Sequence, residues 1–281
     1  MNYSEIIKNA LKEDIGKGDI TTRLIIPKHK KAKAILLAKD NFTACGMNLA
    51  EEVFRSVDKA IKFQALVKDS QNIKKGRVLA KIYGPASSIL SAERVALNFL
   101  SLLSGVATRT KEYVNAVKPY KVKVLDTRKT IPGLRFLQKY AVRCGGGFNH
   151  RMSLDQMIMI KDNHLMITRV DSLWPLADSI KKKNKKVEIE VQNLKEFKGA
   201  LALKPDVIML DNMSIRDIKK AVRIRDSQSN IDYRLSAKLE VSGGINLKNI
   251  HLIASTGVDM ISIGSLTHSL ESKDISLEFI A

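Results

Sequence analysis

Six polar or glycine-containing groups recur along the second part of this 281-residue sequence, each directly after a short apolar run. The groups are Asp126-Thr127-Arg128-Lys129, Lys161-Asp162-Asn163-His164, Glu190, Asp211-Asn212, Ser242-Gly243-Gly244 and Gly264-Ser265. Between the first two groups lies a further polar segment, Asn149-His150-Arg151. The side chains are of three chemical kinds, and each kind indicates a different ligand group.

Cationic side chains dominate the first two groups and the segment between them. A guanidinium holds a carboxylate through two parallel hydrogen bonds, and a lysine supplies a point charge. So many cations together indicate a ligand with more than one carboxylate. For His164, ligand contact and a local hydrogen bond both remain open. The cationic residues are Arg128, Lys129, His150, Arg151 and Lys161.

Acids and glycines make up the remaining groups. The oxygen ligands of Glu190 and Asp211 suit Mg²⁺ or ribose hydroxyls, and salt bridges to nearby lysines are the alternative. Glycine lets a backbone approach an anion closely, and α/β barrels often bind phosphate in the loops after their last strands. Ser242-Gly243-Gly244 and Gly264-Ser265 therefore indicate a phosphate site.

The apolar runs that precede these groups predict a parallel sheet. They are rich in Val, Ile and Met, as strands buried on both faces should be, and they alternate with helix-length segments. In a parallel α/β barrel the carboxyl ends of all strands meet at one face, so the six groups are expected at a single rim. Residues that only end strands are the alternative for any one group. The runs are Val122–Leu125, Met157–Ile160, Val187–Val191, Val207–Leu210, Leu239–Val241 and Met260–Ile263.

The first third of the chain reads as a separate mixed α/β unit. Apolar spacing predicts a helix from about Ser4 to Ile15 and another over Met47–Val57. Ala32–Lys39 and Lys62–Val67 are predicted strands. A long helical stretch follows from about Ser87 to Ala116, with an expected interruption near Ser104-Gly105.

Composition narrows the class of protein. The net charge of +19 attracts anions, including nucleic acid and phosphorylated small molecules. A nucleic-acid-binding protein is the alternative from another class, but aromatic residues make up only 5% and no known binding motif is present. The lysine-rich run 181–186 is expected to be a solvated helix end, with contact to a polyanion as the alternative. We therefore expect small-molecule substrates and no nucleic-acid partner.

Cellular placement is expected to be cytoplasmic. The N-terminus lacks the apolar stretch of a signal peptide, and no apolar run approaches the roughly 18 residues of a membrane span. Cys45 and Cys144 lie far apart and form no Cys-x-x-Cys pair, which fits a reducing compartment and gives no metal motif.

The motifs taken together resemble those of one enzyme family. The segment LDTRKTIPGLRFLQKYAVRCGGGFNHRMSL followed by IKDNH is similar to quinolinate phosphoribosyltransferases, also called nicotinate-nucleotide pyrophosphorylases (carboxylating). The similarity extends in order through EDIGKGDITT, AERVALNFLSLLSG, EVQN, IMLDNMS, EVSGG and IGSLTHS. It therefore spans nearly the whole chain.

The resemblance implies a fold, an assembly and a reaction. The fold would be an N-terminal α/β sandwich domain, residues 1–104 rejoined by 270–281, and an incomplete parallel α/β barrel, residues 105–269. The assembly would be a homodimer in which one subunit's sandwich covers the other's barrel. The reaction would be transfer of phosphoribose from phosphoribosyl pyrophosphate to quinolinate with loss of CO₂, a step of NAD biosynthesis that uses Mg²⁺.

The resemblance also implies roles for particular residues. Lys129, Lys161, Glu190 and Asp211 would be catalytic, with Mg²⁺ bound near the two acids through the diphosphate. Arg94 would come from the partner subunit. The quinolinate site would comprise Arg94, Thr127, Arg128, Lys129, His150, Arg151 and Lys161. The phosphoribosyl pyrophosphate site would comprise Glu190, Asp211, Ser242, Gly243, Gly244, Ile263, Gly264, Ser265 and His268.

Two other enzymes remain as alternatives. One is the molybdenum-associated branch of the same fold. The other is a phosphoribosyltransferase for a monocarboxylate such as nicotinate, which would need fewer carboxylate-binding cations. The complete set of cations in TRK, NHR and KDNH favours quinolinate.

Overall fold

The computed structural model describes residues 3–168, 185–229 and 237–280, so residues 181–184 of the lysine-rich run 181–186, predicted to be a solvated helix end, lie outside the described residues. The chain divides into two units. Unit 1 comprises Met1–Lys111, Ile131–Gly146 and Ser269–Ala281, and unit 2 comprises Glu112–Thr130 and Gly147–His268. Relative to the predicted domains 1–104 with 270–281 and 105–269, this division assigns residues 105–111, Ile131–Gly146 and Ser269 to the first unit.

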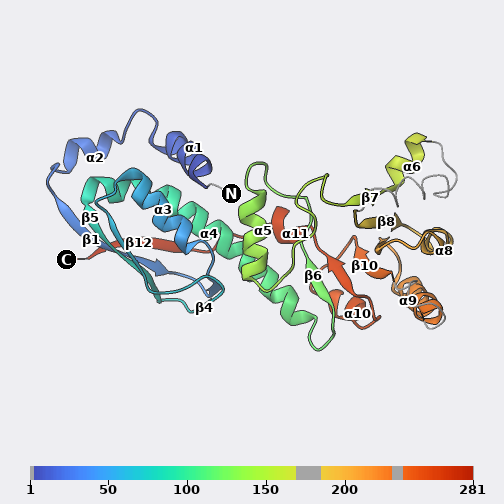
Figure 1. Ribbon diagram of the computed structural model, residues 1–281. Coiled ribbons are helices and arrows are strands. Elements are labelled where there is room, and N and C mark those ends of the chain that lie inside the picture. Colours follow the sequence, from blue (N-terminus) through green and yellow to red (C-terminus); the bar gives the residue numbers. More distant parts are fainter. Residues whose placement is uncertain (1–2, 169–184, 230–236, 281) are drawn as a thin grey trace. The chain divides into compact units, whose positions relative to one another are not determined.

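Unit 1 is built on an antiparallel sheet in the order β12-β1-β5-β3 (Figure 1). The last strand comes from the end of the chain and pairs with β1, as a sandwich closed by the C-terminal residues requires. The strands are β1 (Lys31–Ala38), β3 (Lys62–Ala65), β5 (Val78–Pro85) and β12 (Ile275–Ile280), with a separate pair β2 (Phe42–Thr43) and β4 (Asn72–Ile73). The helices are α1 (Ser4–Ile15), α2 (Ile20–Ile25), α3 (Met47–Val57), α5 (Arg135–Cys144) and most of α4 (Ala86–Ala116).

The predicted interruption of the long helix is wrong, because α4 runs unbroken through Ser104-Gly105. Gly105 serves close packing: a Cβ atom there would lie 2.3 Å from the backbone oxygen of Glu271. The hydroxyl of Ser104 accepts a hydrogen bond from the backbone N–H of Cys45 at 3.1 Å. Both residues thus join the helix to neighbouring chain segments, and neither ends it.

Helix α4 is also the one helix among the described residues that is long and apolar enough to cross a membrane, judged by length and composition. Of its most apolar stretch, 61% is buried inside the structure. Its apolar character is therefore accounted for by packing, as in the core helix of many proteins.

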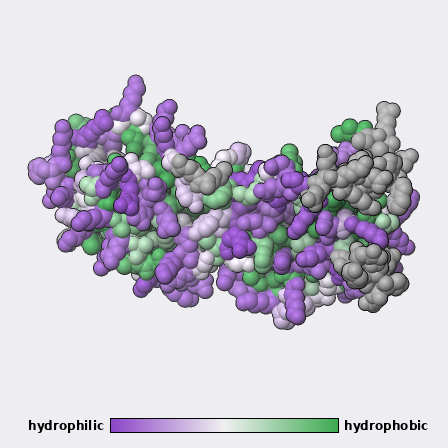
Figure 2. Space-filling model, viewed as in Figure 1, coloured by the Kyte–Doolittle hydropathy of each residue, from purple (hydrophilic) through white to green (hydrophobic). Residues whose placement is uncertain are grey.

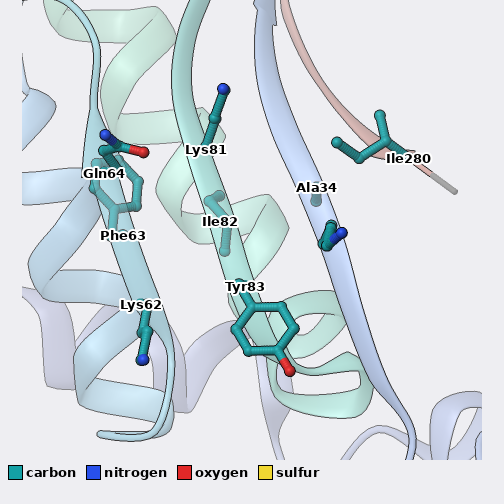
Figure 3. Close-up of a pocket in the computed structure, with 9 residues that line it drawn as sticks. Ala34, Lys62, Phe63, Gln64, Lys81, Ile82, Tyr83 and Ile280 are labelled. Atoms are coloured by element: carbon teal, nitrogen blue, oxygen red, sulfur yellow. The ribbon is translucent and has the colours of Figure 1, made fainter.

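One face of the antiparallel sheet carries a shallow cavity of about 370 Å³ (Figure 3). Tyr83 pairs with Lys33 on one side and with Lys62 on the other, so these three side chains share a face of the sheet. Lys81 lies two residues before Tyr83 and also lines the cavity. No acid and no arginine is among its described lining residues, so it does not match the predicted active site.

Unit 2 contains a parallel sheet of six strands within the described residues, in the order β6-β11-β10-β9-β8-β7. Each strand overlaps one of the predicted apolar runs, and β6 and β7 form the two edges, as in an incomplete barrel. The prediction of an α/β fold with a parallel sheet and a separate antiparallel domain is confirmed. The strands are β6 (Lys123–Leu125), β7 (Ile158–Ile160), β8 (Val187–Val191), β9 (Val207–Asp211), β10 (Lys238–Ser242) and β11 (Met260–Ser262).

Helices follow these strands and complete the βα units. The central strands supply fully buried aliphatic side chains, among them Ile189, Ile208 and Leu239. The described helices of this unit are α6 (Asp162–Thr168), α8 (Leu194–Ala202), α9 (Ile215–Ser229), α10 (Ile250–Ala254) and α11 (Ser265–His268).

Hydrophilic residues are spread over the visible face of both units, with hydrophobic patches between them (Figure 2). They are not gathered into one stripe on that face, which agrees with lysines scattered along the sequence.

Replacing Gly105 by alanine should destabilise the protein, although alanine normally stabilises a helix by about 1 kcal/mol relative to glycine. The added methyl meets the backbone of Glu271, and we expect a loss of about 2 kcal/mol in the free energy of unfolding, measured by urea denaturation. Gly199→Ala is the matched control, because no atom lies within 4 Å of a Cβ atom there. That variant should gain about 0.5–1 kcal/mol. Equal changes in both variants would contradict the packing argument.

Candidate active site

The carboxyl ends of the parallel strands surround a cavity of about 780 Å³ in unit 2. The predicted site residues of this unit all line it, while Arg94 belongs to α4 in unit 1 and its role stays a prediction. The predicted residues brought together are Thr127, Arg128, Lys129, His150, Arg151, Lys161, Glu190, Asp211, Ser242, Gly243, Gly244, Ile263, Gly264, Ser265 and His268. Met159, Met209, Asn212, Ile245 and Ser262 complete the lining.

Two arginines lie close enough in this cavity to affect each other. Burial lowers the pKa of Arg151, and the positive charge of Arg128 lowers it further. The Arg151 guanidinium donates to the backbone oxygen of Met157 at 3.0 Å, which fixes its direction. Like charges held together in a partly buried place are stabilised by an anion between them, so the pair favours binding of a carboxylate.

Backbone contacts hold the loop after β6 that carries Arg128 and Lys129. The Thr127 hydroxyl accepts a hydrogen bond from the backbone N–H of Lys129 at 3.0 Å. The hydroxyl of Thr267, in α11, donates to the backbone oxygen of Lys129 at 2.7 Å. A Cβ atom at Gly264 would lie 3.1 Å from Lys129 Cδ, so glycine lets this lysine approach the last strand.

Asp126 connects β6 to the segment that carries His150 and Arg151. It is fully buried and accepts hydrogen bonds from the Asn149 side chain at 2.5 Å and from the His150 backbone N–H at 2.9 Å. Sequence reasoning placed Asp126 only at a strand end and missed this positioning role. The signal was an acid directly before the Thr127-Arg128 pair.

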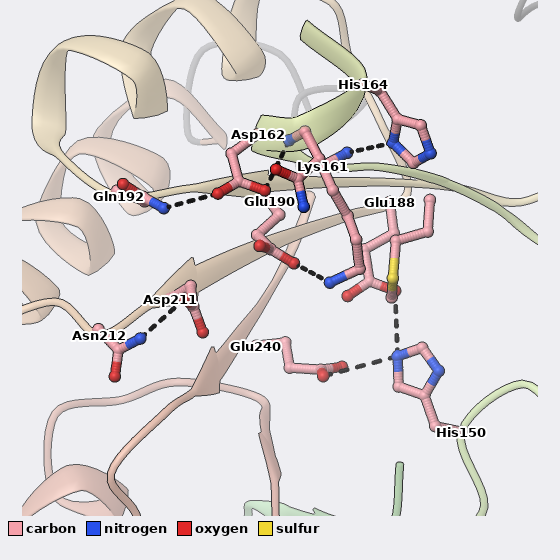
Figure 4. Close-up of polar contacts among 12 residues, drawn as sticks. His150, Lys161, Asp162, His164, Glu188, Glu190, Gln192, Asp211, Asn212 and Glu240 are labelled. Carbon is pink, nitrogen blue, oxygen red and sulfur yellow. Dashed lines mark hydrogen bonds and ion pairs between the residues drawn. The ribbon is translucent and has the colours of Figure 1, made fainter. Parts of the chain in front are cut away.

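The two predicted acids have different partners (Figure 4). Glu190 forms an ion pair with Lys161, and both line the cavity. Asp211 accepts a hydrogen bond from the Asn212 side chain at 2.8 Å. The salt bridge considered as an alternative role for Glu190 therefore exists, and it lies inside the cavity.

Asn212 explains the glycine that follows β10. It adopts a positive φ of 53°, and a Cβ atom at Gly243 would lie 2.2 Å from its side-chain oxygen. Only glycine fits there without a shift of Asn212. The sequence singled out Asp211 and did not include Asn212 in the site, although the two are adjacent.

A buried hydroxyl lies beside the predicted phosphate loops. The Oγ atom of Ser265 is buried and has no hydrogen-bond partner within the described residues, and the same holds for Ser262. Both residues line the cavity. Buried polar atoms are nearly always paired, so these hydroxyls indicate a polar ligand such as a phosphate oxygen.

Beneath the rim, His150 faces two buried glutamates that sequence reasoning missed. Its Nε2 atom lies 3.1 Å from a carboxylate oxygen of Glu188 and 3.6 Å from one of Glu240 (Figure 4). Residues two apart on a strand share a face, so Glu188 lies below Glu190 and Glu240 lies below Ser242. A glutamate inside a buried strand, two residues before a rim residue, was the available signal.

This cluster binds a proton more tightly than its separate groups would. Burial alone would lower the pKa of His150, but the neighbouring carboxylates of Glu188 and Glu240 outweigh it and raise the pKa to about 10. Burial raises the pKa of Glu188. His150 Nδ1 accepts a hydrogen bond from the Arg151 backbone N–H at 2.8 Å, which directs Nε2 and its proton toward the carboxylates. We assign the additional proton to the cluster as a whole, because its groups titrate together.

His164 lies outside the cavity lining. Its Nδ1 atom accepts a hydrogen bond from the Lys161 backbone N–H at 3.0 Å. Of the two roles left open for it, the structure therefore shows the local hydrogen bond.

Comparison with known proteins identifies the family. The model of the quinolinate phosphoribosyl transferase N-terminal domain matches residues 19–104, and that of the C-terminal domain matches residues 106–278. The chain is 42% identical over 280 residues to a probable nicotinate-nucleotide pyrophosphorylase (carboxylating) of Methanocaldococcus jannaschii, covering 98% of this chain and 96% of that one. It is 37% identical to the corresponding protein of Bacillus subtilis, covering 99% and 93%.

Solved structures agree with the sequence comparison. The nicotinate-nucleotide pyrophosphorylase of Ehrlichia chaffeensis aligns with a TM-score of 0.92 at 41% identity, covering 100% of this chain and 99% of that one. The enzyme of Francisella tularensis aligns with a TM-score of 0.88 at 42% identity, covering 98% and 95%. The chain belongs to the quinolinate phosphoribosyltransferase family.

Proposed function

We propose that this cavity condenses quinolinate with phosphoribosyl pyrophosphate, releasing diphosphate and CO₂ to form nicotinate mononucleotide for NAD biosynthesis. The relatives named above carry this activity in their names, and the family model covers both units. The observation that carries the proposal is the meeting of Arg128, Arg151 and Lys161 with two acids and two glycine turns in one cavity.

Quinolinate carries two carboxylates. Arg128, Arg151 and Lys161 supply positive charge to bind them. Arg128 and Arg151 hold carboxylates, because their close approach is relieved by an anion. Lys161 pairs with the carboxylate of Glu190, so a carboxylate of the diacid takes the place of one that this lysine already holds. His150, held from below by Glu188 and Glu240, lies at the base of the site and accepts a hydrogen bond from the Arg151 backbone, which helps to position that arginine.

The sugar phosphate occupies the opposite side of the cavity. Ser242-Gly243-Gly244 and Gly264-Ser265 receive the 5-phosphate, where the free hydroxyl of Ser265 supplies a donor. Glu190 and Asp211 face the ribose hydroxyls. Their carboxylate oxygens on neighbouring strands are also the ligands that Mg²⁺ prefers, so these residues fit the metal carried by the diphosphate. When bound, Mg²⁺ offsets the charge of the departing diphosphate.

The chemistry proceeds in two stages. A bond forms between the pyridine nitrogen and the anomeric carbon while the bond from that carbon to diphosphate breaks, and positive charge develops on the sugar. The carboxylates of Glu190 and Asp211 stabilise that charge through the hydroxyls. The ring nitrogen is then cationic, so the adjacent carbon loses CO₂ and takes up a proton. Lys129 and Lys161 line the cavity and stabilise the carbanion or deliver that proton through water.

Assembly and location complete the proposal. The resemblance of AERVALN supports a homodimer in which Arg94 enters the partner's cavity. Two free cysteines support a reducing cytoplasm. We propose small-molecule substrates alone, with neither nucleic acid nor membrane as a partner.

Product analysis tests the proposed reaction. Nicotinate mononucleotide and CO₂ should form in equal amounts from quinolinate, phosphoribosyl pyrophosphate and Mg²⁺, and neither should form with nicotinate in place of quinolinate. Arg128→Ala should lower kcat/KM by at least about 100-fold, roughly 3 kcal/mol, because a charged bidentate contact is lost. Lys62→Ala is the control, since this cation lines the other cavity and should leave kcat/KM unchanged. Turnover of nicotinate at a rate similar to that of quinolinate would contradict the assignment of quinolinate as the substrate.

Mixed dimers test the shared site. Arg94→Ala and Lys129→Ala enzymes should each be nearly inactive. After subunit exchange, random pairing should restore about a quarter of the wild-type activity, because half of the dimers then have one intact site. Activity is measured alongside mass-tagged exchange. If subunit exchange is complete and activity does not recover, Arg94 acts within its own subunit and not in the partner's cavity.

A further inference from the structure

A second cluster of reactive side chains lies within unit 1, and none of its residues lines the catalytic cavity of unit 2. Cys45 and Cys144 come together there with Asp69, although they are distant in sequence. We propose that Cys45 and Cys144 form a peroxide-reactive thiol pair, with Cys144 as the attacking thiolate and Cys45 as the resolving thiol, that closes to an intramolecular disulfide.

Geometry provides the first support. The two Sγ atoms and a carboxylate oxygen of Asp69 all lie within 4.8 Å of one another. Cys45 precedes α3 and is fully buried, whereas Cys144 ends α5 and keeps 7% of its surface exposed. Both cysteines are buried, and Cys144 is the more exposed of the two, so we expect a small oxidant to reach Cys144 first, with Cys45 as the thiol next to it.

The surroundings of the pair are polar, unlike those of a cysteine that serves only as a small apolar side chain. The Cys45 thiol and then the Ser70 hydroxyl lower the pKa of Cys144 to about 7, which outweighs the opposing effects of burial and of the Asp69 charge. The Cys144 sulfur, to which the Cys45 thiol donates, and then burial raise the pKa of Cys45. The first thiol is thus partly ionised at neutral pH and the second keeps its proton, as an attacking and a resolving cysteine require.

A metal site is the other chemistry that such a cluster allows, and the hydrogen bonds disfavour it. Asp69 Oδ1 accepts from the backbone N–H groups of Gly46 and Met47, both at 3.0 Å, and so caps the start of α3. Asp69 Oδ2 accepts from the Tyr140 hydroxyl at 2.7 Å. Binding a cation would displace these contacts, and the described residues supply no fourth ligand to the cluster.

The reaction balances without a further reagent. The Cys144 thiol loses its proton and the thiolate attacks hydrogen peroxide; an S–O bond forms, the O–O bond breaks, and the hydroxide that leaves takes up this proton as water. The Cys45 sulfur then attacks the resulting sulfenic acid, an S–S bond forms, and the oxygen leaves with the Cys45 proton as water. The sulfurs are oxidised and the peroxide is reduced to water.

Thiol counting on the full-length enzyme tests the pair, because the chain contains only these 2 cysteines. The enzyme is treated with hydrogen peroxide, quenched with catalase, unfolded, and labelled with a thiol reagent. Both thiols should disappear together, the monomer mass should fall by two hydrogen atoms, and dithiothreitol should restore both thiols. Peptide mapping should join the peptides of Cys45 and Cys144.

Single variants assign the two roles. In Cys45→Ser the sulfenic acid on Cys144 should persist and be captured by dimedone. In Cys144→Ser the remaining thiol should oxidise at least about 10-fold more slowly than Cys144 does. Circular dichroism checks that each variant is folded. The thiol-counting experiment on the wild-type enzyme does not depend on the variants.

Three results would overturn the proposal. The first is survival of both thiols under conditions that oxidise free cysteine. The second is a disulfide between chains in place of one within the chain. The third is zinc bound in a one-to-one ratio whose removal exposes the thiols, which would make the cluster a metal site.

Discussion

Repulsion between like charges is the physical constraint on this molecule. The substrates are anions that repel each other, so the cavity must hold an excess of fixed cations, which also repel one another. Burial and the neighbouring Arg128 already lower the pKa of Arg151. Two features offset the repulsion: the Glu190 carboxylate paired with Lys161 at the rim, and the two glutamates around His150 beneath it. The site therefore has two layers of carboxylates, one among the cations of the rim and one beneath it.

The parallel sheet creates these layers through the two-residue period of a strand. Glu188 and Glu190 lie on one face of β8, and Glu240 and Ser242 lie on one face of β10. One member of each pair reaches the rim, while the other is buried at the level of His150. The residues at the strand ends thus determine what the cavity binds. The glutamates two positions earlier hold His150 and set the protonation of the cluster that it forms with them.

Strand-end chemistry could be predicted from the sequence, because it depends on local periodicity and on the convergence of parallel strands. Contacts between distant segments could not. Glu188 and Asp126 acquire their roles only when His150 is brought beside them, and Cys45 meets Cys144 through tertiary packing. The prediction of a helix break at Gly105 was wrong, because glycine is required there by the backbone of Glu271, which is distant in sequence.

A crystal structure of the enzyme with quinolinate alone tests the central claim most directly. The account predicts the diacid in the cavity of unit 2, with its carboxylates in hydrogen-bond contact with Arg128 and Arg151 and with Lys161 released from Glu190. Quinolinate bound only at the lysine-rich cavity of the antiparallel sheet would contradict the account. So would a catalytic cavity left without ligand at saturating quinolinate.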